Sequence, residues 1–238
     1  NQETQIFTQV SVNQTLVVHQ NEAQAPTSIA TSNENQKIFK SLTTLPHTIT
    51  ASSYNDFDRQ LLLLQSYSNE TACLEKGDLN GDGLEDLFVG GNQNNPSQIY
   101  WRQSDGTMKL AEIPVFSEHA FYVDADALIE DFNGDGWKDL LVLSGGYHDL
   151  RAEDPRLMDR LYLNDGQGGL EYFPEGLPNL YHTSTVALAI DWNEDGNQDL
   201  FIGGSTVPGK FPSSYGSTIL LNQGNGRFIT PESNLGID

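Results

Sequence analysis

Short apolar runs separated by glycine-rich turns dominate the chain from residue 71 onward and predict β-strands. The runs at 87–91, 140–146 and 200–204 (LFVGG, LLVLSGG and LFIGG) each end in paired glycines, as expected of a buried strand that closes in a turn. Each is followed by a hairpin signal, two alternating or β-branched segments around a Gly-containing turn. No long segment keeps a 3.6-residue period, although residues 149–160 could form one or two helical turns. The pattern predicts an all-β fold.

An acidic nonapeptide with the pattern D-x-N-x-D-G-x-x-D precedes each of these strands. Its three copies begin at Asp78, Asp131 and Asp191, so they start 53 and then 60 residues apart, a period suited to a four-stranded propeller blade. A further apolar segment precedes each copy, and every unit therefore reads strand, acidic loop, strand, strand, turn, strand. Residues 71–238 are predicted to form β-propeller blades of four antiparallel strands, part of a partial or small propeller with three to four blades in this chain. The three blades carrying the acidic motif are placed at about residues 71–115, 116–178 and 179–238.

Residues 1–70 lack the acidic motif. They are polar and rich in Gln, Asn and Thr, but they contain apolar clusters such as Ile6–Val12 and Leu61–Leu64. We interpret this segment as a degenerate N-terminal blade, or as strands that complete a neighbouring blade.

The acidic motif has the ligand spacing of a calcium-binding loop. Side-chain oxygens at positions 1, 3 and 5 converge on one point, the glycine at position 6 permits a sharp turn, position 7 offers its backbone carbonyl, and position 9 adds a third Asp. The absence of His and Cys from the motif disfavours zinc and copper. The predicted metal ligands are Asp78, Asn80, Asp82, the Leu84 carbonyl and Asp86; Asp131, Asn133, Asp135, the Trp137 carbonyl and Asp139; and Asp191, Asn193, Asp195, the Asn197 carbonyl and Asp199.

The motif does not fit an EF-hand, and it favours Ca²⁺ over Mg²⁺. An EF-hand needs a Glu at position 12 and flanking helices, whereas position 12 here is Val89, Val142 or Ile202 within a predicted strand. Magnesium demands a stricter octahedron and usually keeps several waters, so a loop with five protein ligands favours Ca²⁺. We expect three Ca²⁺ sites that stabilise the fold, each by about 2.7 kcal/mol when the ion is present at about 100 times its dissociation constant.

The composition narrows the choice of partners. The chain has 33 Asp and Glu against 12 Lys and Arg, a formal charge of −21, which disfavours nucleic acid and anionic membranes and favours cations. The longest aliphatic run, Leu61–Leu64, is far too short to span a bilayer, so we expect no direct membrane insertion. Cys73 is the only cysteine, which excludes an internal disulfide and a cysteine-based zinc site. Because the chain begins at Asn1 without an initiator Met, we interpret it as a processed protein or part of a longer one.

The acidic loops and the strands after them resemble the FG-GAP or VCBS repeats of integrin-alpha-like β-propellers. The resemblance is closer to large secreted bacterial propeller proteins that carry ASPIC/UnbV-type modules. It implies calcium in the loop between the first two strands of a blade, a secreted or cell-surface location, and a role in adhesion, scaffolding or surface binding. The matching segments are FDRQLLLLQSYS at 57–68, GDLNGDGLEDLFVGG at 77–91, SGG at 144–146, DRLYLNDGQGG at 159–169 and DLFIGGSTVPGKFP at 199–212.

The sequence departs from the family pattern in two ways. The Phe-Gly-Gly-Ala-Pro signature is absent, and three motifs account for only three or four blades where the family typically has seven. Either the chain is part of a larger ring, or neighbouring chains cover the open blade faces, or an unusually small ring closes.

Three functions are compatible with these features. The leading hypothesis is a non-enzymatic, calcium-stabilised extracellular module that binds a protein or glycan at a cell surface, with the loops at 146–159 and 205–217 as candidate contact regions. The second is a carbohydrate-active enzyme, a glycoside hydrolase or lyase, although no nucleophile elbow, phosphate loop or metal–His cluster is present. The third is a purely structural subunit of a surface assembly. Candidate acids and bases for the enzyme are Asp124 with Asp126, Asp149 with Asp154, and His119, His148 and His182.

Overall fold

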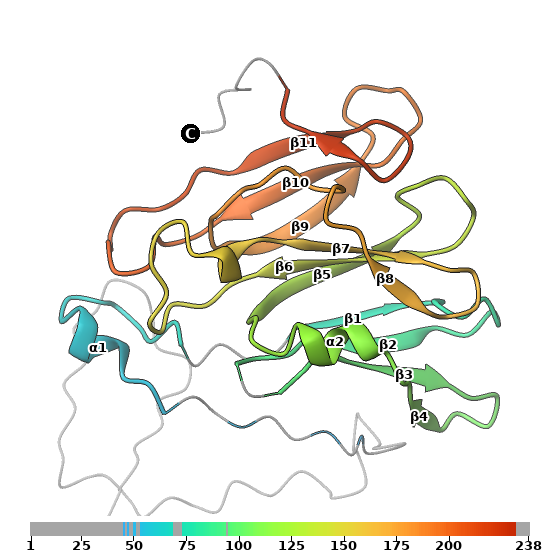
Figure 1. Ribbon diagram of the computed structural model, residues 1–238, viewed down its shortest axis with the longest axis horizontal. Coiled ribbons are helices and arrows are strands. Elements are labelled where there is room, and N and C mark those ends of the chain that lie inside the picture. The colour runs from blue at the N-terminus through green and yellow to red at the C-terminus, as the bar shows by residue number, and fades with distance from the viewer. Residues whose placement is uncertain are drawn as a thin grey trace, which may run out of the picture. The chain divides into compact units, whose positions relative to one another are not determined.

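The chain divides into two compact units, residues 1–44 and residues 45–238. The computed structural model describes residues 53–68, 73–93 and 95–231, together with Leu45, His47 and Thr50, all of which belong to the second unit. Within this unit the strands form three four-stranded sheets that follow one another along the chain (Figure 1).

Each sheet is built from four consecutive strands in antiparallel order. In every sheet the first strand pairs with the second, the second with the third and the third with the fourth. The first sheet contains β1 (Leu74–Gly77), β2 (Asp86–Val89), β3 (Gln98–Arg102) and β4 (Met108–Leu110). The second contains β5 (Asp124–Glu130), β6 (Asp139–Ser144), β7 (Arg160–Asn164) and β8 (Leu170–Tyr172). The third contains β9 (Ser184–Ile190), β10 (Asp199–Gly204), β11 (Thr218–Asn222) and β12 (Phe228–Ile229).

This arrangement confirms the predicted all-β fold of four-stranded antiparallel blades, and it is a small propeller-like fold. The apolar run at 140–146 predicted a buried strand, and all six residues of strand β6 are buried. It lies between two other sheets, so both of its faces must be apolar. The blade boundaries themselves stay a prediction.

Among the described residues, two short helices and a 3-10 turn accompany the strands. Helix α1 (Asp56–Arg59) begins after Asn55, whose side chain accepts a hydrogen bond from the backbone N–H of Phe57. Helix α2 (Pro114–Glu118) has a proline in its first turn, where a missing N–H costs nothing. The 3-10 helix η2 (Pro155–Leu157) is the one helical turn found within residues 149–160, where the sequence allowed one or two. Neither α1 nor α2 has a periodic sequence signal, since each is about one turn long.

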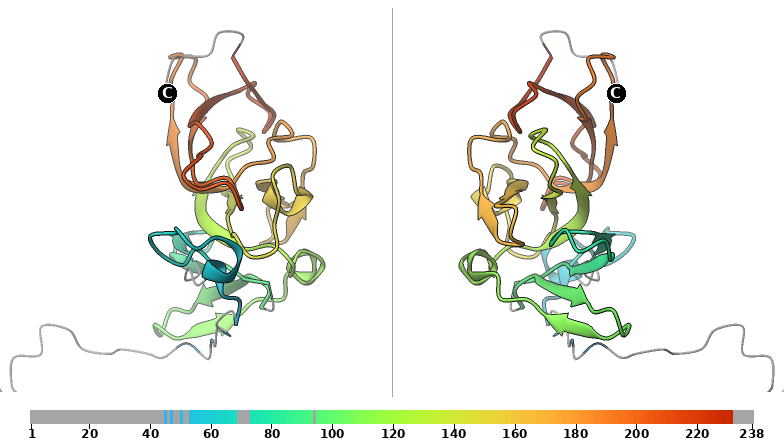
Figure 2. Two further views of the ribbon diagram at one scale, coloured as in Figure 1. Left: turned by 90° about the vertical axis from the view of Figure 1, so that its left-hand side faces the viewer. Right: turned by 90° about the vertical axis from the view of Figure 1, so that its right-hand side faces the viewer.

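The sheets stack face to face, with β5 in contact with β1 on one side and β9 on the other. Figures 1 and 2 show the first and third sheets on opposite sides of the second. One apolar core fills the space between the first and second sheets and includes Phe88, Ile99 and Tyr162. A second core lies between the second and third sheets and includes Leu141, Leu200 and Phe228. The middle sheet therefore contributes to both cores, and the outer sheets to one each.

Cys73 precedes β1 and packs against the first core with a free thiol. Burial, together with the nearby charges of Asp124 and Asp126, raises its pKa to about 12. A thiol with this pKa is a poor nucleophile, consistent with the role of a small apolar residue.

The proposed N-terminal blade at residues 1–70 lies mostly outside the described residues. Its described part holds α1 and no strand. In the described regions of the chain, no helix has the length and apolarity needed to cross a membrane.

Candidate metal centre

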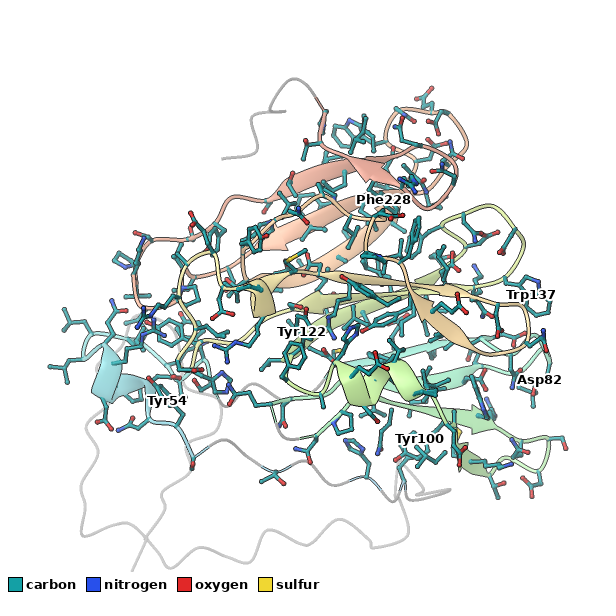
Figure 3. All side chains as sticks on the ribbon, in the orientation of Figure 1. Tyr54, Asp82, Tyr100, Tyr122, Trp137 and Phe228 are labelled. Atoms are coloured by element: carbon teal, nitrogen blue, oxygen red, sulfur yellow. The ribbon has the colours of Figure 1, made fainter. Side chains whose placement is uncertain are left out.

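The three acidic loops occupy the same place in their sheets. Each connects the first strand to the second, so all three lie at one end of the stack (Figure 1). Figure 3 shows Asp82 of the first loop near Trp137 of the second. The Trp137 ring lies so close to Gly81 that an added Cβ would stand 2.2 Å from the ring atom Cζ3, so only glycine fits there. The first and second loops are therefore in contact.

The position-1 carboxylate holds each loop in its turn. In the first loop Asp78 accepts hydrogen bonds from the backbone N–H of Gly81 (2.7 Å) and of Gly83 (2.8 Å). Asp131 does the same in the second loop, from Gly134 at 2.7 Å and Gly136 at 2.9 Å. The position-6 glycines have φ between +84° and +92°, a left-handed conformation that glycine adopts without strain. The motif thus forms the sharp turn that its sequence predicts.

Positions 3 and 5 each accept one further backbone hydrogen bond. The side-chain oxygen of each position-3 Asn accepts from the N–H at position 5, at 2.9–3.1 Å. Each position-5 Asp accepts from the N–H at position 7, at 2.8 Å. These Asx turns fix the side chains on the loop and leave further lone pairs on every oxygen. The residues concerned are Asn80, Asn133 and Asn193 at position 3, and Asp82, Asp135 and Asp195 at position 5.

The position-9 aspartates join the loops to the sheets. Asp86, Asp139 and Asp199 have 0% exposure, and one oxygen of each accepts the N–H of position 2 in its own loop at 3.0 Å. The other oxygen accepts a backbone N–H from the third strand of the same sheet. The donors are Arg102 at 2.9 Å, Asn164 at 2.9 Å and Asn222 at 2.7 Å. Position 9 is therefore a structural anchor, a role that the sequence did not reveal.

Burial makes two of these anchors costly to ionise. Together with the smaller effect of the charges of Asp135 and Asp131, it raises the pKa of Asp139 to about 6, against the opposing effect of two backbone hydrogen bonds. Burial also raises the pKa of Asp86, and the charge of Asp82 adds to the effect. The charges of one loop are thus close enough to repel one another, and a cation among them would relieve that repulsion.

The donor chemistry fits a hard cation. Each loop offers three carboxylates, an amide oxygen and a backbone carbonyl, and each position-9 carboxylate uses two of its roughly four lone-pair sites in the hydrogen bonds above. Throughout the described ranges, however, no three His, Cys, Asp or Glu side chains are gathered as in a preformed metal site. The residues predicted to bind Ca²⁺ therefore share a loop and its turn, and an ion would have to draw their side chains together.

The third loop departs from the first two. Position 4 is Glu194, with φ +60°, where the other loops have glycine. As a result the carboxylate of Asp191 accepts from Asp195 N at 3.0 Å and Gly196 N at 3.0 Å, and not from position 4. Position 2 also differs, because Trp192 is 47% exposed whereas Leu79 and Phe132 are buried at 0% and 1%.

At the opposite end, residues 53–68 fasten the loops that follow β6 and β10. Arg59 donates to the carbonyls of Tyr147, His148 and Leu150 at 2.5–2.8 Å. Gln60 exchanges hydrogen bonds with the backbone of Phe211, at 2.6 and 3.1 Å. Tyr147 and His148 of the 146–159 loop are buried, so neither side chain is free to stack on a ligand.

Asp56 organises this segment and was not predicted as a functional or structural residue. It is fully buried and accepts from Ser66 Oγ, Tyr67 N and both Ser68 N and Oγ. Burial raises the pKa of its carboxyl, but the hydrogen bonds from Ser68, Ser66 and Tyr67 outweigh burial and lower it. Nothing in the local sequence distinguishes Asp56 from an exposed aspartate of a helix start.

The acids considered for catalysis are engaged in other contacts. Asp124 is 2% exposed and forms a buried salt bridge with Arg160 at 2.6 Å, while its other oxygen accepts from Ser97 Oγ at 2.6 Å. Asp149 and Asp154 both pair with Arg156, at 3.4 and 2.9 Å. Asp126 accepts the backbone N–H of Ala187 at 2.9 Å and so links the second sheet to the third.

The histidines considered as bases occupy separate positions. His119 Nδ1 lies 2.8 Å from the Tyr162 hydroxyl, and burial lowers the pKa of the imidazole. His148 and His182 are buried, which lowers the pKa of both. The charge of Asp124 acts on His119 and that of Asp149 on His148, but none of the three histidines forms a hydrogen bond or a salt bridge with the acids above.

Comparison with known proteins supports the repeat interpretation. The FG-GAP-like repeat model matches residues 78–142 and 131–202, which together span 125 of the 238 residues. No curated protein matches the chain. A solved structure that matches is an Agrocybe aegerita lectin described as recognising non-reducing terminal N-acetylglucosamine. It is 18% identical, with a TM-score of 0.42, over 65% of this chain and 36% of the lectin chain. The chain thus corresponds to about a third of that lectin, and a likeness of this size supports no inference about ligand. Because the repeat model matches more than half of the sequence, the chain belongs to the FG-GAP-like repeat family.

Proposed function

We propose that the protein is a calcium-stabilised binding or scaffold module that acts outside the cell, where it contacts a protein or a glycan at a cell surface. The observation that carries the proposal is the threefold recurrence of one acidic loop with one hydrogen-bond scheme. Single Asp- and Asn-rich turns are common surface features, but three in-phase copies at the same end of three stacked sheets are typical of a shared ligand chemistry.

The residues that would hold the ion are positions 1, 3, 5, 7 and 9 of each loop. Three bound Ca²⁺ ions would add six positive charges and change the formal charge of the chain from −21 to −15. Burial is the main cause of the raised pKa of Asp139, and the ion would offset the smaller effect of repulsion from Asp135 and Asp131. It would also tie the exposed part of each loop to the buried anchor at position 9. Calcium would then stabilise the ends of the strands on which the loops are built.

The metal hypothesis is tested by calorimetric titration and by thermal melting of the chain in Ca²⁺, in Mg²⁺ and in excess EDTA. We expect binding of about three Ca²⁺ ions and a higher melting temperature in Ca²⁺ than in EDTA, because an ion that binds only the folded state stabilises it by mass action. Asp135→Asn should reduce the number of sites by one. Glu171→Gln, on the exposed position of β8, is the matched control and should leave the titration unchanged. Identical melting in Ca²⁺ and EDTA would reject calcium as a cofactor of this chain.

The surface-binding role rests on the family and on the location of the loops at 146–159 and 205–217. Both loops are held to the rest of the unit by Arg59 and Gln60, as required of a rigid contact surface, and Arg151 and Lys210 are exposed on them. The resemblance to integrin-alpha-like and secreted ASPIC/UnbV-associated propellers adds the expectation of an extracellular location. The test is a glycan array and a cell-surface binding assay, each with the wild type and with Arg151→Ala/Lys210→Ala. Binding that the double variant keeps unchanged would remove these loops from the proposal.

A further inference from the structure

The ring of Trp137, at position 7 of the second loop, packs against the first loop. A Cβ added at Gly81, position 4 of the first loop, would stand 2.2, 2.9 and 3.3 Å from three atoms of the six-membered part of the indole. A Cβ added at Gly166, in the turn between β7 and β8, would stand 3.0 Å from Trp137 Nε1 at the other part. The ring is 37% exposed, and Figure 3 shows it beside Asp82 of the first loop. Trp137 therefore contacts both the turn of its own sheet and the preceding loop.

The second and third loops do not repeat this contact. Position 7 of the third loop is Asn197, and a Cβ added at Gly224, in the turn between β11 and β12, would lie 3.2 Å from Asn197 Oδ1. Asn197 thus keeps the contact with the turn of its own sheet. At Gly134, which is position 4 of the second loop, an added Cβ would meet no heavy atom of the described residues within 4 Å. Only Trp137 links position 7 of one described loop to position 4 of another.

Gly81 is placed among the predicted ligands of the first loop. It lies between Asn80 and Asp82, and its N–H donates to Asp78 at 2.7 Å. Asp82 N in turn donates to Asn80 Oδ1 at 3.0 Å. A shift of the Gly81 backbone would therefore move the side chains at positions 1, 3 and 5 relative to one another. The Trp137 ring blocks such a shift in one direction.

The backbone of Trp137 belongs to the second site. Its carbonyl is the predicted position-7 ligand, and its N–H donates to Asp135 Oδ1 at 2.8 Å. An ion in the second loop would fix the backbone from which the ring projects. The first loop would then have less freedom to lose when its own ion draws the ligands together, which is a source of positive coupling between two sites. By linkage, an ion in the first loop would raise the affinity of the second by the same factor.

Another link between the loops is shared by both pairs and does not distinguish them. The side-chain amide of Asn164 donates to the carbonyls of Leu79 in the first loop and Lys138 in the second, at 2.7 and 2.8 Å. Asn222 makes the equivalent two bonds between the second and third loops, at 2.8 and 3.1 Å. The two boundaries between loops thus differ in the Trp137 contact and not in this bridge.

We propose that Trp137 is a positioning residue of the first Ca²⁺ site, and that its ring couples calcium binding at the first and second loops more strongly than at the second and third. The inference rests on the proposed calcium function and extends it from three similar sites to one coupled pair and one separate site. The ring acts on the first site through Gly81 and not by contact with the ion.

The first test measures the first site alone. Asp135→Asn together with Asp195→Asn disables the second and third loops, and calorimetric titration then gives the Ca²⁺ affinity of the first. Adding Trp137→Asn, the residue type of the third loop, should lower this affinity about fivefold or more, although the substituted residue lies in a disabled loop. Trp192→Asn, which removes a 47% exposed ring from the third loop, is the matched control and should leave the affinity unchanged. An unchanged affinity in the Trp137→Asn protein would overturn the inference.

The second test follows the ring itself. The chain has three tryptophans, so Trp101→Phe with Trp192→Phe leaves Trp137 as the sole indole. With the second and third loops disabled as above, Ca²⁺ binding to the first loop should change the emission of Trp137 along the same titration curve as the heat signal. A tryptophan that only fills space in the second loop would give constant emission, and that result would contradict the proposal.

The third test does not require calcium. Gly81 and Gly134 have φ of +73° and +77°, so Gly81→Ala and Gly134→Ala introduce similar backbone strain, but the first also meets the Trp137 ring. In EDTA, Gly81→Ala should lower the melting temperature more than Gly134→Ala, and Trp137→Asn should remove the excess. If Gly81→Ala alone does not fold, recovery of folding by Trp137→Asn decides the point. Equal shifts, or no recovery, would show that the ring does not constrain Gly81.

The outcomes separate this inference from the proposed function. A wild-type chain that binds no Ca²⁺ would overturn both. Three bound ions whose affinities are all unaffected by Trp137→Asn would leave the calcium function standing and overturn the coupling alone.

Discussion

The first two acidic loops and the third share one motif but differ in what surrounds them. Their anchors at position 9 make the same two hydrogen bonds in all three repeats, at distances within 0.3 Å of one another. Position 2, however, is core in the first two repeats and exposed in the third, and position 4 changes from glycine to Glu194. The motif fixes the turn and its attachment to the sheet, whereas the next sheet decides whether position 2 is buried.

We expect the largest difference in stability between substitutions at position 2 of the second and third loops. Phe132→Ala removes a side chain with 1% exposure from the core between two sheets, and we expect a loss of about 3–5 kcal/mol in the free energy of unfolding. Trp192→Ala removes a larger but half-exposed side chain, and we expect a loss below about 1 kcal/mol. Urea unfolding in EDTA measures both. Equal losses would mean that Trp192 is already packed against something within this chain.

The sequence was sufficient for most of the fold for a physical reason. Each strand after an acidic loop is buried on both faces or lies against a core, so its apolar run is continuous, and the loop itself is a local structure whose hydrogen bonds join residues two to five positions apart. Local signals of this kind are readable without knowledge of the rest of the chain. The three four-stranded sheets follow from them directly.

What the sequence could not predict depends on contacts between distant residues. Asp56 and Ser68 meet near α1, and Arg59 reaches carbonyls about 90 positions away. The buried Asp124–Arg160 pair joins β5 to β7, and no spacing rule marks these two residues among 45 charged ones. The structural role of position 9 could not be predicted for a different reason. Both a calcium ligand and a hydrogen-bonding anchor at this position can be an Asp, so the sequence does not distinguish the two roles.

The buried anchors Asp139 and Asp199 should contribute differently to the free energy of unfolding. Asp139→Asn keeps the size of the side chain but replaces one acceptor oxygen with an amide that faces either Phe132 N or Asn164 N. We expect a loss of about 2–3 kcal/mol, since a buried donor is left unsatisfied. Asp199→Asn disturbs the same pair of bonds in the outermost sheet, where only one neighbouring sheet packs, and should cost less. Chemical denaturation in EDTA separates this from metal binding, and a larger loss for Asp199→Asn would contradict the ranking.

The boundary between the second and third sheets should also respond to pH. At the boundary between the second and third sheets, Asp159 accepts from Ser144 N at 2.7 Å and Ser184 Oγ at 2.9 Å. Burial raises the pKa of its carboxyl to about 7, against the lowering effect of its hydrogen bonds and of Arg160. A carboxyl whose folded pKa lies above its unfolded value of about 3.9 stabilises the fold below that value, and this stability is lost as pH rises toward 7.

Asp159→Asn should therefore flatten the dependence of melting temperature on pH between about 4 and 7. At the boundary between the first and second sheets, the buried acid Asp124 forms a salt bridge with Arg160 at 2.6 Å instead. Melting scans in EDTA across this pH range give the melting temperatures of the wild type and the variant. The other acidic residues affect both proteins equally, so their effect cancels in the difference between the two melting temperatures. Parallel curves for the two proteins would exclude Asp159 as the titrating group.

We expect the smallest effect on stability at position 4, which is glycine in the first two loops and Glu194 in the third. Gly134 has φ +77° and open space around it, so Gly134→Ala adds no clash and should cost about 1 kcal/mol through the left-handed backbone alone. Glu194 already bears that strain at φ +60°, and Glu194→Gly should relieve it, although the freer unfolded chain offsets part of the gain. The two variants should therefore shift the melting temperature in opposite directions by a few degrees at most. If Glu194→Gly instead destabilises the chain, the Glu194 side chain must make favourable contacts that outweigh its backbone strain. Glu194 would then be a specific feature of the third loop and not a loss of the glycine found in the other two.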